Sequence, residues 1–112
     1  MGTLVYVGGY GSGISVYARD GARLALLGQV AAEDPSYLVA DPRAQRLYAV
    51  NEQDSGAVTG YAVGADGLPR LLSSQPSGGA LPCHLALRRG YLIAANYGSG
   101  SASVHAVGAD GT

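Results

Sequence analysis

The stretch QPSGGALPCHLALRRGYLIAANYG, residues Gln75–Gly98, decides the fold of this chain. It contains a glycine-rich loop, a short apolar segment, a tight basic turn, a second apolar segment and a polar end. A weaker copy occurs upstream as AAEDPSYLVADPRAQRLYAVNEQ, residues Ala31–Gln53, and a partial copy opens the chain as LVYVGGYG, residues Leu4–Gly11. Internal repetition with a period of roughly 20–50 residues indicates a repeat architecture.

The repeat has a regular length. Tyr17, Tyr61 and His105 are each 44 residues apart, and so are the Asp-Gly pairs at residues 66–67 and 110–111. The Pro-x-x-Leu pattern of Pro35–Leu38 returns 47 residues later at Pro82–Leu85. Four short strands in a unit of about 40–50 residues are the signature of a β-propeller blade.

The apolar runs are short and are separated by Gly, Pro, Asp and Asn, which is typical of strands. No window keeps apolar residues at helical spacing between caps, so we expect an all-β protein. The runs VYV, LYAV and LIAA are apolar on both faces, as expected where a sheet lies between two others. The predicted strands are residues 4–7, 14–18, 24–30, 37–40, 47–50, 58–63, 71–74, 85–87, 91–95 and 102–107.

We name the four antiparallel strands of a blade A to D, from the central channel outward. The chain is then predicted to run B-C-D, A-B-C-D and A-B-C, which makes about two and a half blades. Closed propellers contain roughly four to eight blades. We therefore expect residues 1–112 to be a partial β-propeller domain, the N-terminal part of a longer single-domain protein, and to be inactive without the remaining blades.

The composition excludes several classes of partner. Charged residues make up 13% of the chain and the net charge is −1, which argues against nucleic acid and against an anionic membrane surface. No apolar run approaches the roughly 18 residues of a membrane helix, and the N-terminus lacks the features of a signal peptide. With Cys83 as the only cysteine, we expect a cytoplasmic location. The His, Cys and carboxylate spacing predicts no metal, and no other cofactor is expected.

The up-and-down strand order predicts where polar residues gather. In each blade, strand A starts and strand B ends at the same face, near the channel. The side chains expected around this mouth are Tyr10, Tyr37, Glu52, His84, Asn96 and Tyr97. The opposite mouth would receive the A–B turns, DPRAQR and RRG.

His84 is the sharpest candidate for a catalytic residue. An imidazole titrates near neutral pH, so it could act as a general acid or base or bind the substrate. The alternative is a histidine at a strand start that bonds to a neighbouring backbone group. Cys83 should face away from His84, because adjacent strand residues point to opposite faces, and we expect a buried thiol there. His105 aligns with Tyr17 and Tyr61, so we expect it to pack between blades.

Four further residues are candidates for substrate binding: Tyr10, Glu52, Asn96 and Tyr97. Glu52 could act as a base or hold a hydroxyl group, although a solvated loop carboxylate is the favoured interpretation. Asn51 and Asn96 occupy the same repeat position, where we favour a structural turn role, with substrate contact as the alternative for Asn96. Tyr10 and Tyr97 either line the pocket or pack.

These motifs resemble the lactonase-type seven-bladed propellers, which include propeller-type 6-phosphogluconolactonases and related muconate-lactonising enzymes. The similar segments are YVGGYGSGISVY, PSYLVADPRAQRLYAVNE and QPSGGALPCHLALRRGYLIAANYGSGSASVHAV, and they span Leu4–Gly111. The PCH and NYGSGS motifs are specific for the family but not for the substrate. Within this chain, only His84 and the Asn96-Tyr97 pair match family motif positions.

The resemblance implies a cytoplasmic enzyme that hydrolyses a small-molecule sugar lactone without a metal. The expected reaction is 6-phosphogluconolactone to 6-phosphogluconate in the pentose phosphate pathway. It also implies that later blades contribute further His, Arg and Glu side chains to the site. The alternatives are a lactonising isomerase of the same fold and a non-catalytic propeller that serves as a scaffold or binding module.

Overall fold

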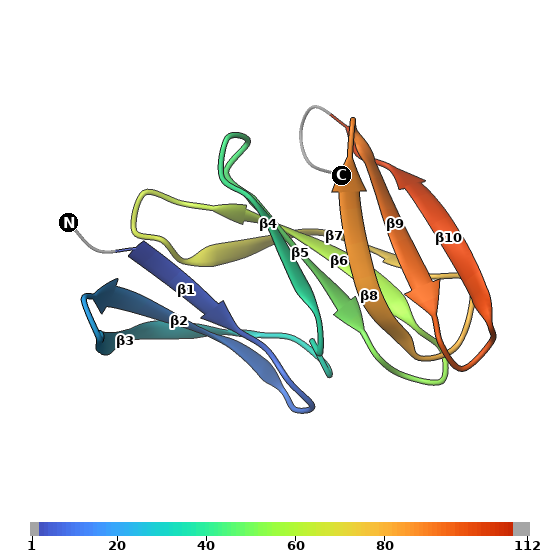
Figure 1. The fold of residues 1–112 in the computed structure, drawn as a ribbon, viewed down its shortest axis with the longest axis horizontal. Helices are drawn as coiled ribbons and strands as arrows, with labels where there is room; N and C mark the ends of the chain where they lie inside the picture. The colour runs from blue at the N-terminus through green and yellow to red at the C-terminus, as the bar shows by residue number, and fades with distance from the viewer. Residues whose placement is uncertain (1–2, 109–112) are drawn as a thin grey trace.

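The computed structural model describes residues 3–108, and in that range it contains strands, turns and irregular segments but no helix. The strands form three antiparallel sheets that follow one another along the chain and stand side by side (Figure 1). The Asp-Gly pair at residues 110–111 lies outside the described residues.

We call the three sheets blades 1, 2 and 3. Blade 1 contains β1 (Thr3–Val7), β2 (Gly13–Asp20) and β3 (Arg23–Ala31), in that spatial order. Blade 2 contains β4 (Leu38–Asp41), β5 (Arg46–Asn51), β6 (Ala57–Val63) and β7 (Pro69–Pro76), also in sequence order. Blade 3 contains β8 (Pro82–Arg88), β9 (Tyr91–Asn96) and β10 (Ser101–Ala106). The predicted all-β order of B-C-D, A-B-C-D and A-B-C is confirmed.

The repeat extends to local irregularities of the ladder. The pairing of β2 with β3 shifts between Val16 and Tyr17, and the pairing of β6 with β7 shifts between Gly60 and Tyr61. A bulge inserts one residue and bends the strand that carries it. The extra residues are Leu27 of β3 and Leu72 of β7, so both D strands bend at the same repeat position, beside the tyrosine that marks the repeat in the sequence.

Strand β5 is buried on both faces. Leu47 and Ala49 join Ile14 of blade 1 in one apolar cluster. Tyr48 and Val50, which alternate with them, join a second cluster with Leu85, Leu92 and Ala94 of blade 3. Because successive strand residues point to opposite faces, one strand supplies the packing surface for two neighbouring blades. This explains why its sequence, LYAV, is apolar without alternation.

Blades 1 and 3 are covered on one face only within the described residues. Strand β3 of blade 1 exposes Leu24, Leu26 and Leu27, while blade 3 exposes Tyr91, Ile93 and Val104. Large exposed apolar patches mark surfaces that contact another protein element. The two outer faces are thus the surfaces where further blades would pack.

Backbone hydrogen bonds join neighbouring blades just before each A strand. The Asp34 N–H donates to Gly11 O at 2.7 Å, and the Leu81 N–H donates to Gln53 O at 2.8 Å. Both Asp34 and Leu81 have positive φ angles, 44° and 53°, which is uncommon for residues other than glycine. The same turn therefore fixes the start of each A strand against the B–C loop of the preceding blade.

The close approach at Gly8 generates the first prediction. A Cβ at residue 8 would lie 1.9 Å from Pro35 O, whereas a Cβ at Gly11, in the same loop, would meet no atom within 4 Å. We expect Gly8→Ala to destabilise the fold by about 1–3 kcal/mol through overpacking. Gly11→Ala should change stability little. Urea unfolding of the longer protein that the sequence predicts measures both, and equal midpoints for the two variants would contradict the tight contact.

The open edges generate the second prediction. In the described residues, six strands have only one paired neighbour each: β1, β3, β4, β7, β8 and β10. Unpaired strand edges and exposed apolar faces promote association between copies. We expect residues 1–112, expressed alone, to oligomerise or aggregate at micromolar concentration. Size-exclusion chromatography with light scattering tests this, and a monomer with a cooperative thermal transition would contradict it.

Candidate functional site

The loops that follow strands B and precede strands A form one face of the fold, which we call the mouth. Here the Tyr10 hydroxyl of blade 1 donates to the Glu52 carboxylate of blade 2, with distances of 3.1 Å to Oε1 and 3.0 Å to Oε2. The Ser36 hydroxyl donates to Oε1 of the same carboxylate at 2.5 Å. Two hydroxyl groups from two blades therefore converge on one carboxylate.

Glu52 is half-buried and has two hydroxyl partners. It is therefore not the freely solvated loop carboxylate that the sequence favoured. Its backbone N–H donates to Asp34 O at 3.1 Å, which fixes the end of β5 beside the start of β4. The carboxylate is held at the interface between blades 1 and 2, where it can act as a hydrogen-bond acceptor. We call the interface between two neighbouring blades a seam.

The Glu52 carboxylate changes the acidity of its neighbour. Its hydrogen bond and its negative charge raise the pKa of the Tyr10 phenol, with smaller contributions from desolvation, Cys83 and Asp34. Both effects favour the neutral phenol.

His84 lies on the exposed surface at the start of β8. Its ring contacts the Tyr37 ring of blade 2, with centroids 4.4 Å apart and planes tilted by 36°. Tyr37 in turn packs against the apolar cluster between blades 2 and 3. The imidazole is thus held by an anchored aromatic ring, and its side chain makes no hydrogen bond to another described residue.

Cys83 departs from the predicted position. The register of β8 on β9 shifts between Pro82 and His84, so Cys83 is the extra residue of a bulge. The thiol-bearing residue is half-buried, not buried as the strand alternation predicted. The prediction was wrong because a bulge interrupts the alternation on which it rested.

The two asparagines at the ends of B strands tie loops together. Asn51 donates to Glu33 O at 2.7 Å and accepts from the Thr59 hydroxyl at 2.7 Å. Asn96, only 2% exposed, donates to Ser77 O at 3.1 Å. Both side chains brace the loop that precedes the A strand of their own blade, as the favoured structural interpretation predicts. Asn96 is therefore buried behind the mouth surface.

Two tyrosines project from the mouth into solvent. Tyr10 is 76% exposed and Tyr97 is 78% exposed, so neither packs into a core. The Tyr97 N–H donates to Leu81 O at 3.0 Å, as the Glu52 N–H does to Asp34 O. Tyr97 and Glu52 thus occupy equivalent positions in blades 3 and 2. Tyr10 is their counterpart in blade 1, because the Gly11 oxygen that follows it accepts from Asp34 N–H as the Gln53 oxygen after Glu52 accepts from Leu81 N–H. Successive blades present Tyr, Glu and Tyr.

Ser36 is the member of the group that sequence reasoning missed. It lies between Pro35 and Tyr37, and Cys83 lies in the same repeat position between Pro82 and His84. The repeat could have indicated Ser36 as a site residue, because the residue between the proline and the aromatic residue at the start of each A strand lies at the mouth. Ser36 was missed because a single serine, without a partner in the sequence pattern, does not indicate a site.

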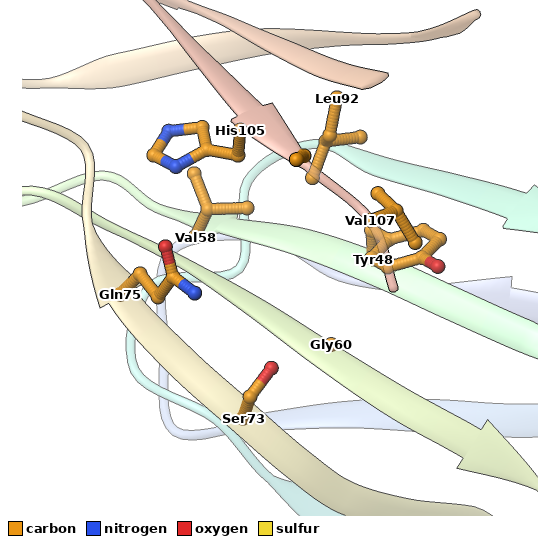
Figure 2. A pocket seen from close by; sticks show the side chains of 9 residues that line it. Tyr48, Val58, Gly60, Ser73, Gln75, Leu92, His105 and Val107 are labelled. Atoms are coloured by element: carbon orange, nitrogen blue, oxygen red, sulfur yellow. The ribbon is translucent and has the colours of Figure 1, made fainter. Parts of the chain in front are cut away.

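A small cavity lies between blades 2 and 3 (Figure 2). Its volume is about 30 Å³, close to the space of one water molecule. Its lining includes His105, Tyr48 and Leu92, and the His105 ring bonds to the Ser103 hydroxyl at 2.9 Å. His105 therefore lies at the seam between blades, as predicted, and the cavity cannot hold a sugar-sized ligand.

Two searches of the described residues are simply negative. Among residues 3–108, no group of three or more His, Cys, Asp or Glu is arranged to hold a metal ion. The same range contains no helix with the length and apolarity needed to cross a membrane.

Comparison with known families identifies the family of this chain. Residues 4–112 match the family described as "Lactonase, 7-bladed beta-propeller". The chain belongs to this lactonase family. Its three sheets are accordingly blades of a partial propeller, and the resemblance to the lactonase-type seven-bladed propellers is confirmed. No curated protein gives a match.

Solved structures of this lactonase family superpose closely. A protein from Bacteroides fragilis, provisionally named a 6-phosphogluconolactonase, is 31% identical with a TM-score of 0.93, over 99% of this chain and 34% of that one. A provisionally named 6-phosphogluconolactonase from Bacteroides uniformis is 30% identical with a TM-score of 0.94, over 99% and 35%. The periplasmic gluconolactonase of Pseudomonas aeruginosa is 31% identical with a TM-score of 0.86, over 96% and 35%. The chain thus spans about a third of the length of these proteins.

The Tyr10–Glu52 contact generates the third prediction. In Glu52→Gln, the negative charge that raises the Tyr10 pKa is removed, so the Tyr10 pKa should fall toward the ordinary value of 10.0. Tyr61, whose pKa is raised by burial alone, should not move. NMR titration of ¹³Cζ-labelled tyrosine measures both.

The sign of the accompanying stability effect follows from the raised pKa. The contact favours neutral Tyr10, so its contribution is complete below the unfolded pKa and is lost as pH rises through the folded pKa. A Tyr10 signal that titrates identically in the wild type and in Glu52→Gln would show that the contact does not form in solution.

Proposed function

We propose that the longer protein carrying this chain hydrolyses a sugar lactone. The observation that carries the proposal is the family match over residues 4–112, supported by relatives named as lactonases. The finer proposal is hydrolysis of 6-phosphogluconolactone to 6-phosphogluconate in the pentose phosphate pathway. A cytoplasmic location is part of it, although the related gluconolactonase of Pseudomonas aeruginosa is periplasmic.

His84 is the proposed general base. Its exposed imidazole makes no side-chain hydrogen bond to another described residue. The Tyr37 ring contacts the imidazole and holds it in place. The neutral imidazole would take a proton from water while the water oxygen attacks the lactone carbonyl carbon. The resulting tetrahedral anion collapses, the bond between the carbonyl carbon and the ring oxygen breaks, and that oxygen takes up a proton. The product is the open-chain hydroxy acid.

Stabilisation of the tetrahedral anion requires donors or positive charge near the carbonyl oxygen. The seven arginines of this chain lie at the A–B turns, at the C–D turns or on the strand ends beside them, which is the face opposite the mouth. Cationic groups for the anion, and for a substrate phosphate, would therefore come from further blades. Blades 1 to 3 would supply the base and the lactone-facing surface.

The fourth prediction tests the reaction. The longer protein should accelerate hydrolysis of 6-phosphogluconolactone over its spontaneous rate in a pH-stat assay, and no acceleration of this or any other sugar lactone would refute the proposed function. Acceleration of gluconolactone alone would retain lactone hydrolysis and remove the phosphorylated substrate. Formation of a lactone from a muconate would instead indicate the lactonising isomerase.

The role of His84 is tested by substitution. His84→Ala should lower kcat by about 10²-fold or more, the contribution expected from general base catalysis, with an unchanged melting temperature. His105→Gln is the matched control, because His105 lies at the seam between blades 2 and 3 and away from the mouth. An unchanged kcat in His84→Ala together with lower stability would assign His84 a structural role.

A further inference from the structure

The group of side chains around Glu52 has an unusual balance of donors and acceptors. A tyrosine or serine hydroxyl carries one proton, and both Tyr10 and Ser36 direct theirs at the Glu52 carboxylate. The ionised carboxylate itself only accepts. What this group can still offer to a ligand is therefore acceptor capacity: the unused lone pairs of the carboxylate and of the two hydroxyl oxygens.

A hydrogen-bonded group that offers acceptors and no free donors, as Tyr10, Glu52 and Ser36 do, selects its ligands. It suits hydroxyl groups, which donate, and it is unsuited to phosphate or carboxylate groups, which accept. The local charge acts in the same direction. The mouth carries the acidic residues Glu33, Asp34, Glu52 and Asp54, whereas the arginines lie at the opposite face. An anionic ligand group would be repelled here.

Aromatic residues in the two neighbouring blades complete the surface. Tyr10 and Tyr97 hold the equivalent positions in blades 1 and 3, and both are more than three-quarters exposed, at 76% and 78%. Tyrosine rings offer a large apolar face together with a polar end. Exposed rings at the equivalent positions of the two blades that flank the carboxylate-bearing blade match a ligand that has C–H faces and hydroxyl edges, which is the surface chemistry of a sugar ring.

We propose that Tyr10, Glu52 and Tyr97 form a subsite for the uncharged, hydroxyl-bearing part of the lactone, and that Ser36 is a positioning residue that fixes the Glu52 carboxylate. This inference rests on the proposed lactone hydrolysis and adds the part of the substrate that blades 1 to 3 contact. A phosphate on the substrate would lie away from this subsite. Ser36 acts through Glu52, whose Oε1 it bonds.

The test compares substrates with and without hydroxyl groups in the longer protein. For Glu52→Gln, the ratio of kcat/KM for glucono-δ-lactone to that for δ-valerolactone should fall about tenfold or more, which is the loss expected for hydrogen bonds to a charged acceptor. The change should appear mainly in KM. Tyr91→Phe, an exposed tyrosine at the opposite end of blade 3, is the matched control and should keep the wild-type ratio.

Ser36 has its own readout. Ser36→Ala should lower the same ratio several-fold through KM, and Ser36→Thr, which retains the hydroxyl, should restore it. Ser15→Ala removes a serine whose hydroxyl accepts from Gln29 Nε2 at 2.9 Å within blade 1 and does not bond to Glu52, and it should have no effect on the ratio. A purely structural role for Ser36 would lower the melting temperature while the ratio stayed constant, and that result would remove its positioning role.

Binding of an inert analogue separates this inference from the proposed function. Calorimetry with glucono-δ-lactam, which resists hydrolysis, should give a Kd about tenfold weaker in Glu52→Gln than in the wild type. If the wild type hydrolyses no lactone but binds the lactam through Glu52, the proposed function fails and the subsite stands. If hydrolysis is observed but the substrate ratio and the lactam Kd are unchanged in Glu52→Gln, the subsite is wrong and lactone hydrolysis stands.

Discussion

Two-sided burial of strand β5 is the constraint on which the rest of the structure depends. Leu47 and Ala49 complete the seam with blade 1, and Tyr48 and Val50 complete the seam with blade 3. Each well-buried aliphatic side chain contributes roughly 1.5–3 kcal/mol of transfer free energy. Because the two seams share one strand, the polar ends of three blades are held beside one another. The mouth is therefore a product of packing that takes place deeper between the sheets.

Much of this architecture was predictable because it repeats. The 44-residue spacing and the non-alternating apolar runs required stacked four-stranded units, and every predicted strand is present within three residues of its expected bounds. The topology then placed Tyr10, Glu52 and His84 on one face without knowledge of any side-chain contact. Periodicity succeeds here because each blade must bury the same surfaces against its neighbours.

The details of the site were less predictable, for two physical reasons. Cys83 was expected to be buried because strand residues alternate, but the bulge at the start of β8 breaks that alternation, and bulges leave no clear mark in a single sequence. Ser36 and Glu52 were undervalued because their roles depend on a partner in another blade. Tyr10 lies 42 residues from Glu52, so their contact follows from the seam and not from local pattern.

The adjacency of Leu47 and Tyr48 has a geometric consequence for the ring. These neighbours in the sequence occupy opposite seams, so the volume of each side chain wedges a different pair of blades apart. Protein interiors are close-packed, and a change in side-chain volume must be taken up by displacement of the sheets. Substitutions in this one strand would thus tilt blade 1 and blade 3 independently. The width of the central channel would therefore depend on side chains that do not line it.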